Sequence, residues 1–220
     1  MAKKQIIIWT VNLSLVLVAA VLAWIYGPSM VVEAKYQEQV KQQDFGGGAG
    51  FSSLMYSMTG FSEILDDKSL MAPIDPNFGL VIPKIFANVS VSQDVNPEVA
   101  VQYQAVLRQA GGVAHAAGSS VPGEAGTTYI FGHSTDAGFN VNRYNAVFYL
   151  LKKLEPGDEI IAYYKGQDYH YLVTEKKVVE PTDISDITNV ANESKLVLQT
   201  CWPPGTTWKR LLIIAKPKAD

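Results

Sequence analysis

The sequence contains only one cysteine, Cys201, among its 220 residues. An internal disulfide is therefore impossible, and the paired cysteines of a structural zinc site are missing. With three histidines in the whole chain, we expect no metal and no other cofactor. The lone cysteine has two interpretations: a buried thiol that only packs, since free cysteine is among the most buried residue types, or a reactive nucleophile.

Clustered positive charge is also lacking. The 18 Lys and Arg residues are outnumbered by 21 Asp and Glu residues, which gives a formal net charge of −3, and no basic patch is present. Binding to phosphate backbones needs clustered cations, so we expect no nucleic acid partner. A glycine-rich run at 112–126 lacks the Gly-Lys-Ser/Thr ending that a phosphate-binding loop requires.

One long uncharged apolar run, Ile6–Tyr26, stands at the N-terminus. Its length suits a helix that crosses a hydrocarbon core of about 30 Å. Lys3 and Lys4 precede it and favour a cytoplasmic N-terminus. We therefore expect a single-pass cell membrane protein, with residues 1–30 as cytoplasmic tip and anchor and the catalytic domain outside. Cleavage near Val32–Ala34, which would release a secreted protein, is the alternative.

The chain after the anchor divides into a stalk and a globular domain. Residues 31–76 are mainly polar and include a flexible break at Asp44–Gly50 and a second at Met71–Pro76. We interpret residues 31–76 as an extracytoplasmic stalk and residues 77–220 as a globular domain.

Short β-branched and aromatic runs separated by turns predict a mainly β barrel or sandwich. The expected strands are Phe78–Ile82, Ile85–Val91, Thr127–Phe131, Asp158–Tyr164, Asp168–Thr174, Lys176–Glu180, Leu196–Thr200 and Leu211–Ala215. Short helices are expected at Glu98–Gln109 and Arg143–Leu154, with one helical turn within Pro181–Asn189.

The residues suited to chemistry stand at strand ends. Cys201 follows one apolar run, Arg210 begins the next, and His133 follows Gly132 at the end of a third. An imidazole can take the proton of a thiol, and a guanidinium can stabilise an oxyanion, so these three types together suit acyl transfer. His115 is a second histidine that could line such a site, whereas we interpret His170, within a strand, as structural or exposed.

Several motifs in order make the sequence resemble the sortase family over residues 78–217. They are Leu80–Lys84, His115–Glu124, Ile130–Ser134, Leu154–Asp158, and Leu198–Cys201 followed by Arg210.

The resemblance implies a closed eight-stranded β-barrel with two or three short flanking helices, preceded by one transmembrane helix. It implies a cysteine transpeptidase that cleaves a C-terminal sorting signal of the Leu-Pro-x-Thr-Gly type in surface proteins. The acyl group would pass to an amine of a cell-wall precursor or a pilin lysine. It makes Cys201 the nucleophile, His133 the acid/base, and Arg210 the ligand of substrate and oxyanion, with Thr200 helping to shape the oxyanion site.

Two residues depart from the pattern of many relatives: Val197 replaces a threonine and Phe131 replaces a small residue. Because of these two departures, the resemblance does not determine which sorting motif is recognised or which sortase subclass this is. We take Phe131, Trp202 and Trp208 as further candidate substrate-binding residues, the tryptophans because they flank the loop between Cys201 and Arg210. A peptidase that passes the acyl group to water, and an inactive membrane-tethered module that binds peptides, are the alternative functions.

Overall fold

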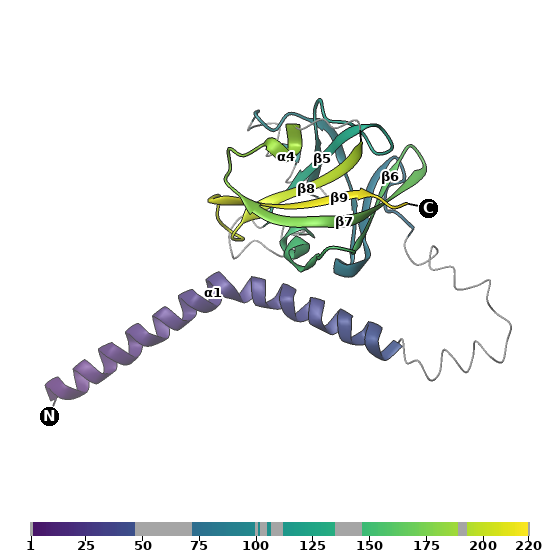
Figure 1. The fold of residues 1–220 in the computed structure, drawn as a ribbon. Coiled ribbons are helices and arrows are strands. Elements are labelled where there is room, and N and C mark those ends of the chain that lie inside the picture. The colour runs from purple at the N-terminus through teal and green to yellow at the C-terminus, as the bar shows by residue number, and fades with distance from the viewer. Residues whose placement is uncertain are drawn as a thin grey trace, which may run out of the picture.

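The computed structural model describes residues 2–46, 72–99, 101, 105–106, 112–134, 147–188 and 193–219. The chain begins with one long helix, α1, and continues into a mainly β domain with three short helical segments among its described residues. Figure 1 shows the domain as a curled sheet, with α1 as a long, bent helix beside it.

Nine strands form a single sheet in the order β2-β1-β6-β7-β9-β8-β5-β4-β3. The strands are β1 (Phe78–Ile82), β2 (Ala87–Ser90), β3 (Ser92–Val95), β4 (Val113–Ala116), β5 (Gly126–Gly132), β6 (Glu159–Tyr164), β7 (Gln167–Val179), β8 (Ser194–Trp202) and β9 (Lys209–Pro217). The two edge strands, β2 and β3, are joined in the chain through Val91 alone. The sheet is therefore a nearly closed barrel.

The predicted mainly β class is confirmed, but the predicted count of eight strands is wrong. The expected strand Ile85–Val91 pairs with β1 only over Ala87–Ser90, and the chain then changes partner and runs parallel to β4 as β3. β4 lies in the glycine-rich run, where no alternation indicated a strand.

β7 replaces two predicted strands, Asp168–Thr174 and Lys176–Glu180. It runs unbroken through both, and a shift in its pairing with β9 lies between Val173 and Glu175. This shift is the position at which sequence analysis had separated them. A β-bulge keeps a strand continuous while disturbing its alternation, which explains the false break.

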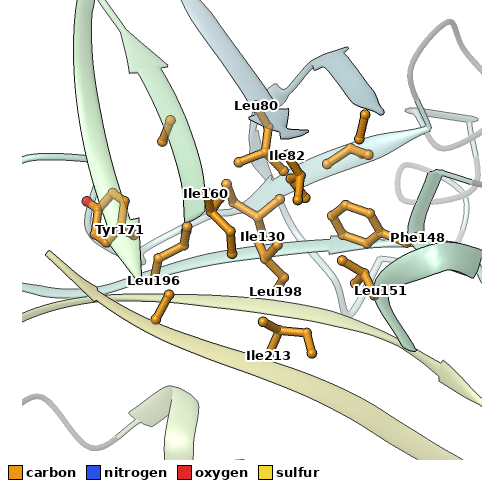
Figure 2. Packing of buried hydrophobic residues seen from close by; sticks show 14 of the residues in the cluster. Leu80, Ile82, Ile130, Phe148, Leu151, Ile160, Tyr171, Leu196, Leu198 and Ile213 are labelled. Atoms are coloured by element: carbon orange, nitrogen blue, oxygen red, sulfur yellow. The ribbon is translucent and has the colours of Figure 1, made fainter. Parts of the chain in front are cut away.

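Two layers of apolar side chains lie on the two faces of the sheet. The larger cluster fills the barrel and includes Leu80, Ile130, Leu198 and Ile213; Figure 2 shows these side chains pointing toward one another from different strands. The smaller, outer cluster consists of Val95, Ala114, Ala116, Tyr129, Phe131, Val197, Leu212 and Ile214. Successive residues of a strand point to opposite faces, so β5, β8 and β9 contribute to both layers.

The short helical segments are η2 (Pro83–Ile85), η3 (Val147–Lys153) and α4 (Ser185–Thr188). The predicted turn of helix within Pro181–Asn189 is confirmed as α4. The predicted helix Arg143–Leu154 is, over its described part, the shorter 3₁₀ helix η3, whose residues Phe148 and Leu151 join the barrel core. The predicted helix Glu98–Gln109 lies largely outside the described residues.

Helix α1 spans Ala2–Gly46 and continues from the apolar run into the polar segment without a break. Pro28 lies within it and cannot donate a backbone hydrogen bond, and Figure 1 shows α1 as two straight halves that meet at a bend. Among the residues that the structure describes, no helix meets the length and hydropathy expected of a membrane span.

The second half of α1 contacts the domain at η2 and η3. Tyr36 is buried, and its ring meets that of Phe86, just after η2, edge-on with centroids 6.2 Å apart. Lys153 Nζ donates a hydrogen bond to Glu33 and also lies over the Tyr36 ring, 5.2 Å from its centroid. Lys152 Nζ lies 3.8 Å from Glu33. The hydrogen bond from Lys153 holds the pKa of Glu33 below its usual range, so this contact is charged at neutral pH.

Candidate active site

The candidate nucleophile and the candidate guanidinium are direct partners in the sheet. β8 and β9 are antiparallel, and their register places Cys201 opposite Arg210. Directly opposite residues of an antiparallel pair point to the same face, with Cβ atoms about 5 Å apart. The two residues that sequence analysis singled out therefore stand together on one face of the barrel.

The candidate base follows on the next strand. β5 runs parallel to β8 with Phe131 level with Gln199, and the Thr200 hydroxyl donates to the Gly132 carbonyl oxygen at 3.0 Å. Continuing this register by two residues, one past the end of β5 at Gly132, brings His133 level with Cys201. Adjacent strands lie about 4.8 Å apart, and Figure 1 shows β5, β8 and β9 side by side. Cys201 and Arg210 are therefore neighbours, and His133 directly follows the strand next to that of Cys201, although it is not among the described lining residues of the groove below.

The position before His133 leaves no room for a side chain, so it needs glycine. It ends β5, and a Cβ placed on it would lie 2.9 Å from Phe148 Cδ2 and 3.0 Å from the Gly112 carbonyl oxygen. η3, through Phe148, therefore packs directly on the backbone that precedes His133.

Alternation along β8 decides which side chains accompany Cys201. Val197 belongs to the outer cluster and Leu198 to the barrel core, and Gln199 and Cys201 continue the outer face. The thiol of Cys201 is free and only partly buried. The interpretation of Cys201 as a buried packing residue is therefore wrong, and the thiol is reachable from outside the barrel.

A groove of about 740 Å³ runs over the outer face and includes both Cys201 and Arg210. Its lining comes from the turn at 97–98, from residues 116–120, from β5 and β8, and from the segment 181–188 that contains α4. α4 lies against β5. Tyr129, Phe131, Ile184 and Ile187 make much of the groove apolar, whereas the end formed by Cys201 and Arg210 is polar.

Arg210 is held by the loop between β8 and β9. Its Nη1 donates to the carbonyl oxygens of Thr207 and Lys209, both at 3.1 Å. A guanidinium carries five N–H donors, so two bonds from Nη1 fix its position without exhausting its donors. The group can therefore offer a fixed donor and a permanent positive charge to an oxygen bound beside Cys201.

The structure places the five tentative substrate-binding residues differently. Thr200 and Phe131 line the groove, although both are largely buried. His115 is fully buried and is not among the described lining residues, although it directly precedes the lining residues 116–120. Trp202 packs against the barrel core, on the strand face opposite Cys201, because alternation turns it inward. Trp208 is exposed and is not among the described lining residues.

Several lining residues were missed by sequence analysis. Tyr129 and Gln199 each lie two residues before a predicted site residue, so strand alternation could have found them. Ile184, Ile187 and the loop 116–120 reach the groove only through the fold, and no local signal marks them. Within the described part of the chain, no group of three or more His, Cys, Asp and Glu residues could hold a metal ion.

Comparisons with known proteins agree on one family. A family model for the sortase domain matches residues 80–218. One similar solved structure is sortase A from Corynebacterium diphtheriae, with 24% identity, a TM-score of 0.53 and coverage of 66% of this chain and 61% of that chain. Another is sortase C-1 from Actinomyces oris, with 23% identity, a TM-score of 0.54 and coverage of 70% of this chain and 81% of that chain. Sortase C from Clostridium perfringens with the C-terminal cell wall sorting motif matches with 23% identity, a TM-score of 0.54, and 68% and 74% coverage. A search of the curated proteins found no match.

Proposed function

The chain belongs to the sortase family of cysteine transpeptidases, and we propose that it cleaves C-terminal sorting signals of the Leu-Pro-x-Thr-Gly type and transfers the acyl group to an amine. One observation carries this proposal. Cys201 and Arg210 are direct register partners that line the same groove, beside the strand end that bears His133.

The first half of the reaction needs an ionised thiol and a bound carbonyl. The Cys201 thiolate attacks the carbonyl carbon of the threonine, and the resulting oxyanion accepts hydrogen bonds from Arg210. Collapse of the tetrahedral intermediate breaks the bond to the glycine nitrogen and leaves a thioester on Cys201. His133 donates a proton to the departing amine, because an imidazolium can act as general acid near neutral pH.

The second half reverses these roles. An incoming amine attacks the thioester carbonyl carbon, and His133 takes the proton that the amine loses. The new amide bond forms as the carbon–sulfur bond breaks, so the thiolate returns and no other reactant is consumed. We propose the amine of a cell-wall precursor or of a pilin lysine as the acceptor.

The groove suits the apolar part of such a signal. Tyr129, Phe131, Ile184 and Ile187 lie along the lining that leads to Cys201. A leucine and a proline before the cleaved bond would bury apolar surface there at about 25 cal/mol per Å². The substrate proposal therefore predicts that peptides with polar residues at these two positions bind more weakly.

Product analysis tests the function. The full chain in detergent micelles is incubated with a mixed library of sorting peptides, with and without an added primary amine, and analysed by mass spectrometry. We expect an adduct on Cys201 that ends at threonine, and a ligated product only when amine is present. Hydrolysed peptide in equal yield with and without amine would favour the peptidase, and the absence of any adduct would favour a peptide-binding module.

We also propose that the N-terminal part of α1 anchors the protein in the cell membrane, with a cytoplasmic N-terminus and the barrel outside. Apolar side chains are exposed along the first half of the helix, among them Trp9, Leu13, Leu17 and Trp24, and such a helix gains from contact with lipid. The single cysteine provides the test: a membrane-impermeant maleimide should label Cys201 on intact cells. Labelling only after lysis would contradict this topology.

A further inference from the structure

His115 is the one described histidine that lies in the barrel interior. It lies in β4, its side chain has no exposed surface, and its register partner on β5 is Ile130 of the barrel core. Its ring meets that of Phe78 with centroids 5.3 Å apart. A polar ring in an apolar core costs stability unless its nitrogens find partners, so its contacts indicate what the residue does.

One nitrogen of the ring is well satisfied. Nε2 lies 3.1 Å from the carbonyl oxygen of Ser120, which can only accept, so Nε2 carries the hydrogen. The same N–H reaches Ser119 Oγ at 2.8 Å, and that hydroxyl donates to the Ala116 carbonyl oxygen at 2.8 Å. The backbone N–H of Tyr129 donates to Ser119 Oγ at 3.4 Å. His115 therefore belongs to a small hydrogen-bond network that connects it through Ser119 and Ser120 to the loop 116–120.

The other nitrogen is unsatisfied. Nδ1 is buried and has no hydrogen-bond partner among the described residues. The carboxylate of Asp94 lies 3.7 Å away, which is too long for a hydrogen bond, and it cannot donate to a bare ring nitrogen. A phenyl ring would remove this unpaired acceptor, but it would also remove the N–H that Ser120 and Ser119 accept, so the Nε2 contacts are what a histidine supplies here.

The network ends at the groove. Residues 116–120 line it together with Tyr129, and these are the residues that His115 and Ser119 tie together. The backbone N–H of Ser120 is bonded to the Thr127 carbonyl oxygen on β5 at 2.9 Å. His115 thus holds the loop from inside the barrel while the loop faces the groove outside.

We propose that His115 is a positioning residue that fixes the loop 116–120 as one wall of the peptide groove. It touches no reacting atom. It acts through the contacts of Nε2 with Ser119 and Ser120, while its Nδ1 remains buried without a hydrogen bond. This inference rests on the proposed peptide-cleaving function, because it assigns the wall to substrate binding.

The test compares two substitutions in the full chain in micelles. His115→Phe keeps a ring of similar size and removes the donor, whereas His115→Gln keeps an N–H near the position of Nε2. We expect His115→Phe to raise KM for a sorting peptide about fivefold to tenfold, which corresponds to one lost hydrogen bond. kcat should change less than twofold, and His115→Gln should restore most of KM.

Thermal unfolding separates positioning from a structural role. His115→Phe removes the unpaired Nδ1 but also takes the Nε2 donor from the Ser120 carbonyl oxygen, and these two effects oppose each other. The melting temperature of His115→Phe should therefore stay within about 5 °C of the wild type. A fall in melting temperature with unchanged KM would overturn the proposal. Should His115→Phe not fold, Ser119→Ala is tested in its place. This variant removes the hydroxyl that contacts His115 Nε2, so it should raise KM to a similar degree.

A second measurement stands apart from catalysis. Amide hydrogen exchange at residues 117–120 should be faster in His115→Phe than in the wild type, and exchange in β9 should not change. Unaltered exchange at 117–120 would refute the positioning role even if the wild-type chain cleaves no sorting peptide. A wild-type chain without activity would refute the proposed function alone.

Discussion

Cys201→Ala should abolish cleavage of a sorting peptide, with a loss of at least about 10⁴-fold in kcat, and should leave the barrel folded. The thiol is the only nucleophile of its kind in the chain, and it lines the groove beside Arg210. Covalent catalysis has no substitute nucleophile at this position, so residual turnover would reflect binding and oxyanion stabilisation only.

Stability should change little in this variant. Cys201 is only partly buried, and alanine keeps the β-strand backbone and its register with Arg210. The free energy of unfolding should therefore fall by less than about 1 kcal/mol. Peptide turnover and thermal unfolding are measured together. Val178→Ala, an exposed change on β7 at a residue that is not among the described groove lining, is the matched control and should retain full activity. Normal turnover by Cys201→Ala would rule out the nucleophile assignment.

Arg210→Lys should lower kcat/KM about 10²-fold to 10³-fold, mainly through kcat. This is the usual cost of removing one fixed donor to an oxyanion. The guanidinium is anchored through Nη1 on the carbonyl oxygens of Thr207 and Lys209, which leaves its other donors available to an oxyanion from a fixed position. A lysine ammonium is a point charge on a flexible chain and cannot keep both sets of contacts.

The neighbouring residue supplies the control for this prediction. Lys209 is exposed and pairs with Glu180 at 3.0 Å, and only its backbone carbonyl contacts Arg210. Lys209→Ala should therefore stay within about twofold of wild-type kcat/KM, because exposed ion pairs contribute little. Steady-state kinetics on both variants decides the matter: equal rates for Arg210→Lys and Lys209→Ala would show that the planar group is not needed.

The apolar, β-branched and aromatic runs of the sequence indicated much of the fold. These short runs located β1, β6, β8 and β9 and the turn between β6 and β7, because such a run and the turn residues that bound it are local properties of the sequence. This signal failed at β4, whose four residues include two alanines and His115. Such a strand is specified by its neighbours β3 and β5 rather than by its own composition.

The sequence by itself determined that one thiol, one histidine after a strand and one arginine at the head of a strand were available for acyl chemistry. Only the tertiary structure decided that Cys201 faces the groove while Trp202 faces the core, and that His115 holds the groove wall from within. It also decided that α4 and the loop 116–120 complete the groove. The reason is physical: strand periodicity is a property of consecutive residues, whereas a groove is made by segments that barrel closure brings together from distant parts of the chain.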